Sequence, residues 1–221
     1  MSGVPARGGA PLRDLREDAK DLFPTIYLTL VSMVQALALE ELLDVALRGD
    51  PRPAGARGAL LGLQLFAVFV GLLVVWHDYV LGVIRYRYVV GLQDSLIPFL
   101  LAFGEFGLIE STRRGSLVAW FLWWAVLLAM GVWIYVHQYT RARADPANGD
   151  VDARWGPFTL RQRVAFLAGG ALAALALAAW VRVAGPPPAL LAPVVAALGA
   201  SLVGYAALTA LSWRRVISPS R

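Results

Sequence analysis

The sequence contains no cysteine, which excludes disulfide bonds, iron–sulfur clusters and thiolate metal sites. Charge is scarce, because only 16% of the 221 residues are charged and Lys20 is the single lysine. So little charge excludes an ordinary soluble domain. Walker loops, nucleophile elbows and His-Glu-x-x-His motifs are also missing from the sequence, and we therefore expect a protein that is not an enzyme.

Long apolar segments take up most of the chain. Hydrophobic residues make up 58% of it, and the mean hydropathy is +0.62. A helix that crosses a bilayer needs about 20 apolar residues. Six segments have this character: 22–46, 59–84, 90–109, 116–139, 164–184 and 189–212. The sequence therefore predicts an all-α, polytopic membrane protein with six transmembrane helices, flanked by polar tails at 1–21 and 213–221.

The arginines indicate how these helices are oriented. Most of the 20 basic residues lie in the two tails and in the connections after the second and fourth segments. Cytoplasmic segments of membrane proteins carry such an excess, so we expect both termini in the cytoplasm. The preference for arginine over lysine, with much Ala, Gly, Leu and Val, is typical of a GC-rich bacterial genome and indicates an inner-membrane protein. The net charge of +5 then reflects orientation and anionic headgroups, and no nucleic-acid partner is expected.

Hydroxyl side chains follow one face of the first segment. Thr25, Thr29 and Ser32 are spaced as successive helical turns, and Leu39 continues the same face. Hydroxyls that give way to a bulky apolar residue are typical of a water-filled path ending in a hydrophobic constriction. In the alternative interpretation, each hydroxyl bonds to a carbonyl one turn earlier and only packs.

Three carboxylates stand near the expected outer end of the first segment, namely Glu40, Glu41 and Asp44. Carboxylates at the mouth of a pore concentrate cations there. Alternatively, these acids pair at the membrane interface with arginines of the neighbouring connections, namely Arg48, Arg52, Arg57, Arg113 or Arg114.

Ionisable residues also lie inside the apolar segments, at His77, Asp78, Asp94, Glu105 and His137. Such groups cost a few kcal/mol each at membrane depth, so they mark either a function or a paired internal site. A histidine near carboxylates can change its charge between about pH 5 and 8. The alternative is a structural His–Asp or Asp–Arg pair that joins helices.

The two histidines allow a second hypothesis. His77 and His137 fall at similar depth on different segments, as the two axial ligands of a b-type haem would. No other cofactor is expected. A metal is not expected either, because His77, Asp78 and His137 lack the spacing of a metal-binding motif.

The last two segments contain no acid and no histidine, and they are rich in glycine and alanine. Small residues let helix backbones approach closely, so we expect these segments to serve packing and the first four to carry the chemistry. The tryptophans of the fourth segment are expected to face lipid or the membrane interface: Trp120, Trp123, Trp124 and Trp133.

Several short motifs resemble the pattern of the six-helix bacterial relatives of the endolysosomal transmembrane potassium channel: Trp76-His77, Leu92, Pro98-Phe99 and Gly104-Glu105. The resemblance covers residues 22–110. The family's helix-one signature is Arg, three residues and Phe-Ser-Asp, and its nearest counterpart here is Phe23-Pro24-Thr25. The resemblance implies a pore lined by the first helix, with bulky apolar residues as its constriction, in an assembly of several subunits.

These patterns together favour a cation channel or channel-like pore for potassium, protons or other monovalent cations, formed by a homo-oligomer in the lipid bilayer. Two alternatives stay open. One is a membrane electron-transfer protein with haem between the two histidines. The other is a non-conducting scaffold or accessory subunit that binds a partner through its helices.

Overall fold

The computed structural model describes residues 12–48, 53–86 and 91–218, and all regular structure within these ranges is helical. The elements in chain order are α1 (Leu12–Arg48), α2 (Gly55–Arg85), α3 (Leu92–Arg113), α4 (Leu117–Arg143), the short 3-10 helices η1 (Pro146–Asn148) and η2 (Ala153–Trp155), α5 (Leu160–Ala184) and α6 (Pro188–Ile217). Six helices in the described ranges are long and apolar enough to cross a bilayer. The prediction of an all-α protein with six such helices is confirmed, and these are the features of a multi-pass membrane protein.

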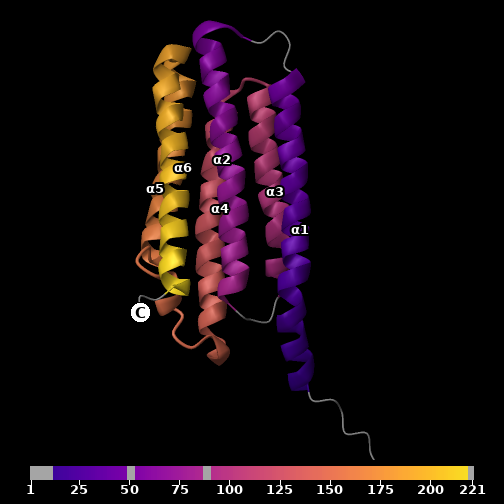
Figure 1. Ribbon diagram of the computed structural model, residues 1–221. Coiled ribbons are helices and arrows are strands. Elements are labelled where there is room, and N and C mark those ends of the chain that lie inside the picture. The colour runs from indigo at the N-terminus through magenta and orange to yellow at the C-terminus, as the bar shows by residue number, and fades with distance from the viewer. Residues whose placement is uncertain (1–11, 49–52, 87–90, 219–221) are drawn as a thin grey trace, which may run out of the picture.

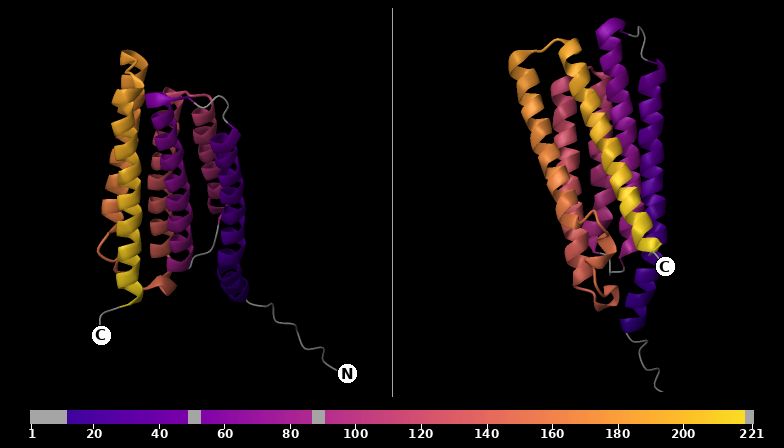
Figure 2. Two further views of the ribbon diagram at one scale, coloured as in Figure 1. Left: turned by 45° about the horizontal axis from the view of Figure 1, so that its top comes forward. Right: turned by 60° about the vertical axis from the view of Figure 1, so that its left-hand side comes forward.

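The six long helices form two layers of three (Figure 1). In one layer α2 packs between α1 and α6, and in the other α4 packs between α3 and α5. Helices α1 and α3 pack against each other and join the layers along one edge. Helix α1 begins and α6 ends at the same end of the bundle (Figure 2), which we call the terminal end. The opposite end, where α1 ends and α2 begins, is called the distal end.

The helices are longer than the apolar segments that predict them. Helix α1 begins at Leu12, within the segment expected to be a polar tail, and α6 continues to Ile217. Helix α4 runs four residues beyond the expected end, to Arg143. Arginine, glutamate and alanine are good helix formers, so a helix continues into polar sequence until a breaker ends it. The apolar segments therefore mark the membrane-length part of each helix and not its ends.

One face of α1 is buried against α2 and α3, and it is not the face that carries Thr25 and Thr29. The buried positions recur every three or four residues: Tyr27, Val31, Gln35, Ala38, Leu42 and Val45. This spacing keeps them in one stripe along the helix. The stripe contains one polar residue, Gln35, which therefore projects into the bundle.

The central helices of the two layers, α2 and α4, face each other through side chains. Gly71 of α2 makes room for the Trp124 side chain of α4, because a Cβ at position 71 would lie 2.4 Å from the Trp124 ring. Trp120 and Trp124 are buried, which corrects the expectation that they face lipid. Trp133 is exposed, as expected for a side chain that faces lipid. The tryptophans of α4 thus lie on both sides of that helix, because hydropathy alone does not distinguish a core-facing from a lipid-facing ring.

The start of α5 is fixed by a capping box. The Thr159 hydroxyl accepts a hydrogen bond from the backbone N–H of Gln162, and the Gln162 side chain accepts one from the backbone N–H of Thr159. The reciprocal bonds satisfy backbone donors at the helix start. Helix α5 therefore begins four residues earlier than expected, and Arg163 belongs to its first turn. At its other end Gly185 adopts a left-handed conformation, with φ 54°, before the Pro-rich connection to α6.

Candidate functional site

An aspartate of α2 joins three helices near the terminal end of the bundle. Asp78 Oδ2 accepts a hydrogen bond from the Tyr135 hydroxyl of α4 at 2.6 Å and one from the Tyr205 hydroxyl of α6 at 2.8 Å. The two hydroxyl oxygens lie 2.7 Å apart. Both tyrosines are buried. Directed hydrogen bonds to a carboxylate inside the bundle stabilise its charged form where water does not.

Arg163 of α5 supplies the positive charge of this network. Its side chain is 1% exposed, and its Nη1 lies 3.8 Å from Asp78 Oδ1. Nη1 also donates to the Thr209 hydroxyl at 3.0 Å, and Nε donates to the Phe158 carbonyl at 3.1 Å. The guanidinium carbon lies 4.8 Å from the centre of the Phe158 ring, within the range of a cation–π contact.

The contributions of α5 and α6 to this network correct the expectation that the last two helices serve packing alone. Sequence reasoning placed Arg163 in a polar connection, and it treated Tyr135 and Tyr205 as part of the apolar background. The capping box at Thr159 was the available signal, because it places the start of α5 before Arg163. No pattern in the sequence indicates which carboxylate the two tyrosines meet.

A second buried acid, Asp94, lies in the first turn of α3. Its Oδ2 accepts from the backbone N–H of Gly91 at 2.7 Å, which caps the helix start. His137 Nε2 of α4 lies 2.9 Å from Asp94 Oδ1, and Arg141 Nη2 lies 3.7 Å from Oδ2. The carbonyl of Asp94 also accepts a hydrogen bond from the Tyr27 hydroxyl of α1. This arrangement is the His–Asp and Asp–Arg pairing that the sequence left as an alternative, with His137 and not His77 as the histidine.

The third interior acid, Glu105, has the fewest hydrogen-bond and ion-pair partners of the three among the described residues. Glu105 of α3 is 1% exposed, and its Oε1 accepts a hydrogen bond from Gln35 Nε2 of α1 at 2.6 Å. Among the described residues, its other oxygen, Oε2, has no hydrogen-bond partner. The sequence predicts Glu105 but not Gln35, because the face of α1 that enters the core was assigned to the hydroxyl residues.

Glu105 and Asp78 line one cavity between the two layers, with a volume of about 90 Å³. Its walls come from α2, α3, α4, α5 and α6 and are mostly aliphatic and aromatic. On α2 the lining runs from Val68 to Tyr79, which is roughly 16 Å of helix. The cavity is therefore elongated along the helices, and it brings together two of the three interior acids, Asp78 and Glu105. Asp94 is not part of its lining.

An open depression of about 640 Å³ lies at the distal end, lined by both acidic and basic side chains and by Gln64. Gln64 of α2 and Thr112 of α3 border it, while Val68 and Leu108 border the interior cavity. Each pair is four residues apart, so about one helical turn separates the two spaces. Trp120 of α4 is fully buried. Along α4 it lies between Leu117, which lines the depression, and Trp124, which lines the interior cavity.

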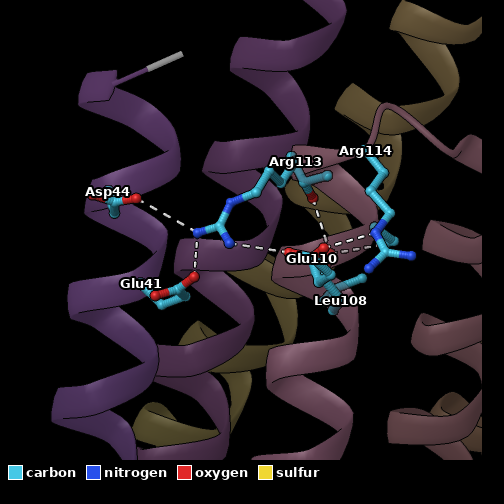
Figure 3. A network of polar contacts seen from close by, with 8 residues as sticks. Glu41, Asp44, Leu108, Glu110, Arg113 and Arg114 are labelled. Atoms are coloured by element: carbon cyan, nitrogen blue, oxygen red, sulfur yellow. Dashed lines mark hydrogen bonds and ion pairs between the residues drawn. The ribbon is translucent and has the colours of Figure 1, made fainter.

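The acids at the distal end form ion pairs (Figure 3). Arg113 Nη2 contacts Glu41 and lies 3.5 Å from Asp44, and its Nη1 donates to Glu110 at 3.1 Å. Asp44 also pairs with Arg48 at 2.7 Å. Glu41 and Asp44 thus adopt the pairing that the sequence left as an alternative, while Glu40 is exposed. All these side chains are more open to solvent than those of the three interior acids.

The hydroxyl face of α1 is exposed and not buried in the bundle. Thr25, Thr29, Ser32 and Leu39 are all exposed. Thr29 donates to the carbonyl of Thr25 at 2.8 Å, and Trp76 Nε1 donates to Ser32 at 3.5 Å. These residues line neither the interior cavity nor the depression at the distal end. They can line a path only where another molecule faces them.

The two histidines have different surroundings. The His137 ring is stacked on Trp133, with 5.6 Å between ring centres, and its Nε2 is bonded to Asp94. His77 Nε2 is buried and has no hydrogen-bond partner among the described residues. Binding of haem iron by His137 Nε2 would break its contact with Asp94. In the described ranges, no group of three or more His, Asp or Glu side chains is placed to hold a metal ion.

Comparison with known proteins adds nothing to these observations. No protein-family model, curated protein or solved structure matches the chain.

Proposed function

We propose that this chain translocates monovalent cations across the bacterial inner membrane, as a channel or channel-like pore. The observation that carries the proposal is Glu105, a carboxylate buried at mid-length of the bundle that faces a cavity with one oxygen unpartnered among the described residues. An ionisable group at such depth marks an ion or proton pathway by default. The excess of arginine at one side supports the assigned orientation.

The spaces inside the bundle favour an interior route. A cation would enter the depression at the distal end, pass the turn occupied by Trp120 and reach the cavity at Glu105. It would leave through the hydrogen-bonded cluster of Asp78, Tyr135 and Tyr205 towards the terminal end. Hydroxyls and carboxylates in contact with one another can pass a proton along the chain of hydrogen bonds, so protons are the first ion to test.

Ion flux into liposomes tests this proposal. Purified protein is reconstituted, and the fluxes of protons, potassium and sodium are measured with internal dyes under an imposed gradient. Glu105→Gln keeps the size of the side chain and removes its charge, and we expect it to lower the flux at least tenfold. If the native protein passes no monovalent cation at any pH, neither these three nor a small organic ammonium ion, the proposal is wrong.

A second route has its own support. The exposed hydroxyls of α1 can face the axis of a homo-oligomer, as the resemblance to the potassium-channel relatives implies, with Leu39 as the constriction. In that arrangement Ser32→Lys places a positive charge in the path and lowers cation flux, while Glu105→Gln has little effect. If the interior route is used, Glu105→Gln lowers the flux and Ser32→Lys has little effect. The same flux experiment on the two variants therefore distinguishes the two routes.

A further inference from the structure

The interior cavity combines apolar walls with a few polar groups at defined positions. Aliphatic side chains such as Leu101, Leu127 and Leu202 cover most of it, and the rings of Trp124 and Phe166 cover much of the rest. Binding sites for small molecules have this composition, with a few polar groups that fix the orientation of the ligand. The walls therefore suit a ligand with an apolar body.

Three residues of the lining carry a buried polar atom without a hydrogen-bond partner among the described residues. They are Glu105 Oε2, the Tyr79 hydroxyl and Trp124 Nε1. Buried polar groups in native proteins are almost always bonded, to protein, water or a ligand. Three such atoms on one cavity indicate that its occupant has polar groups of its own, with a hydrogen-bond donor for the carboxylate.

The two carboxylates of the cavity differ in what neutralises them. Asp78 has two tyrosine hydroxyls and the guanidinium of Arg163. Among the described residues, Glu105 has only the amide of Gln35 as a partner, and that amide carries no charge. A buried carboxylate without a cationic partner is costly, so a cation that donates a hydrogen bond to Oε2 would be strongly favoured there.

The chemistry of the walls discriminates between kinds of cation. A dehydrated alkali ion needs a shell of several oxygen ligands, as in a filter built from carbonyls. The lining of the cavity is mostly carbon, so it suits such a shell poorly. An alkylammonium ion needs one acceptor for its N–H groups, and its alkyl part gains from apolar walls and aromatic faces. At about 90 Å³ the cavity is smaller than the ~150 Å³ that holds benzene, so the ligand must be compact.

We propose that this cavity is a binding site for a compact alkylammonium ion, with Glu105 as its counter-charge and the aromatic and aliphatic walls around its alkyl part. The proposal rests on the assignment of the chain as a cation translocator, and it names the substrate class of that same site. It also assigns a role to Gln35, which holds Oε1 so that Oε2 faces the ligand.

The test uses two compact probes of the same shape, ethylammonium and ethanol, with the full chain in detergent. Saturation-transfer NMR of the methyl signal measures the affinity for each. We expect the ammonium to bind at least tenfold more tightly than the alcohol, because only the ammonium forms a charge-assisted bond with Glu105. Glu105→Gln should remove this difference, while the weak affinity for the alcohol stays the same.

A matched control is Glu110→Gln, the same substitution on the same helix, where the side chain is exposed at the distal end. It should leave the preference for the ammonium unchanged. A second variant, Leu202→Trp, fills the cavity and should weaken both probes. Thermal melting of each variant establishes that it is folded.

Equal binding of the two probes, or a preference that survives in Glu105→Gln, overturns the assignment of an alkylammonium site. So does the absence of binding in a folded protein. Because binding is measured without a membrane gradient, this result is independent of flux. Proton flux without ammonium binding leaves the proposed function standing and refutes the ligand, whereas ammonium binding without any flux does the reverse.

Discussion

Arginine and acidic residues contact one another both at the distal end and inside the bundle. At the distal end these side chains are partly exposed to solvent, whereas inside the bundle they are largely shielded from it. Arg113 contacts Glu41, Asp44 and Glu110, and all four side chains are partly exposed. Arg163 faces Asp78 with 1% of its own side chain exposed. Exposed pairs gain little because water solvates the separated charges almost as well. A buried pair is different, because the loss of one partner leaves a charge that nothing solvates.

An acid inside the bundle that lacks a cationic partner is a better indicator of function than an exposed acid that has one. The distal acids are numerous and neutralised by neighbours on the surface, so their number says little about function. Inside the bundle, Asp78 and Asp94 have cationic partners, whereas Glu105 has only an amide. Their cationic partners offset the cost of placing the first two inside the bundle. The protein retains Glu105 at a cost in stability, which points to a function.

Removal of the buried guanidinium is expected to have the largest effect. Arg163→Met removes the guanidinium that pairs with Asp78 and should lower the free energy of unfolding by about 3–5 kcal/mol. Thermal melting in detergent measures the loss. Arg161→Met, on an exposed neighbour, serves as control and should change little. Adding Asp78→Asn to Arg163→Met should recover part of the stability, and a double variant less stable than the single one would contradict the assigned pair.

A smaller effect of opposite sign is expected at Glu105. The Glu105→Gln substitution removes a buried charge that has no cationic partner, so the unfolding free energy should rise by about 1 kcal/mol. The same melting experiment measures it. A marked loss of stability would mean that the carboxylate is structural, which would weaken the contrast with Asp78 and the case for transport.

The smallest effect is expected at the distal end. Glu41→Gln removes one ion pair of Arg113 and should lower the unfolding free energy by less than about 1 kcal/mol. Salt screens exposed charges, so the difference should shrink further between low and high ionic strength. A loss as large as that of Arg163→Met would show that the distal network is as important to folding as the interior one.

The helices could be predicted from sequence because membrane-length apolar segments are a local signal. Residues 116–139 were expected as a span, and α4 runs from Leu117 to Arg143. The ionisable residues of the interior were also found, because Asp78, Asp94 and Glu105 interrupt apolar sequence. Their location in that sequence was enough to select them.

The partners could not be predicted, because pairing depends on how helices rotate about their axes. Gln35 was set aside, although it occupies the buried stripe of α1 and holds Glu105. His77 was grouped with Asp78 by adjacency, whereas Asp78 bonds to two tyrosines from distant helices. Neighbours in sequence on a helix point in different directions, about 100° apart, so adjacency is a poor guide to contact.

The link between Asp78 and Tyr205 has a consequence for biosynthesis, since the two residues are 127 positions apart. Ribosomes release the chain from its N-terminus, so α2 enters the bilayer long before α5 and α6 exist. During that interval the acid of α2 has neither its arginine nor its second tyrosine. Completion of the final hairpin therefore supplies the missing partners of this acid. Chains that stop before it should be recognised and degraded by membrane proteases.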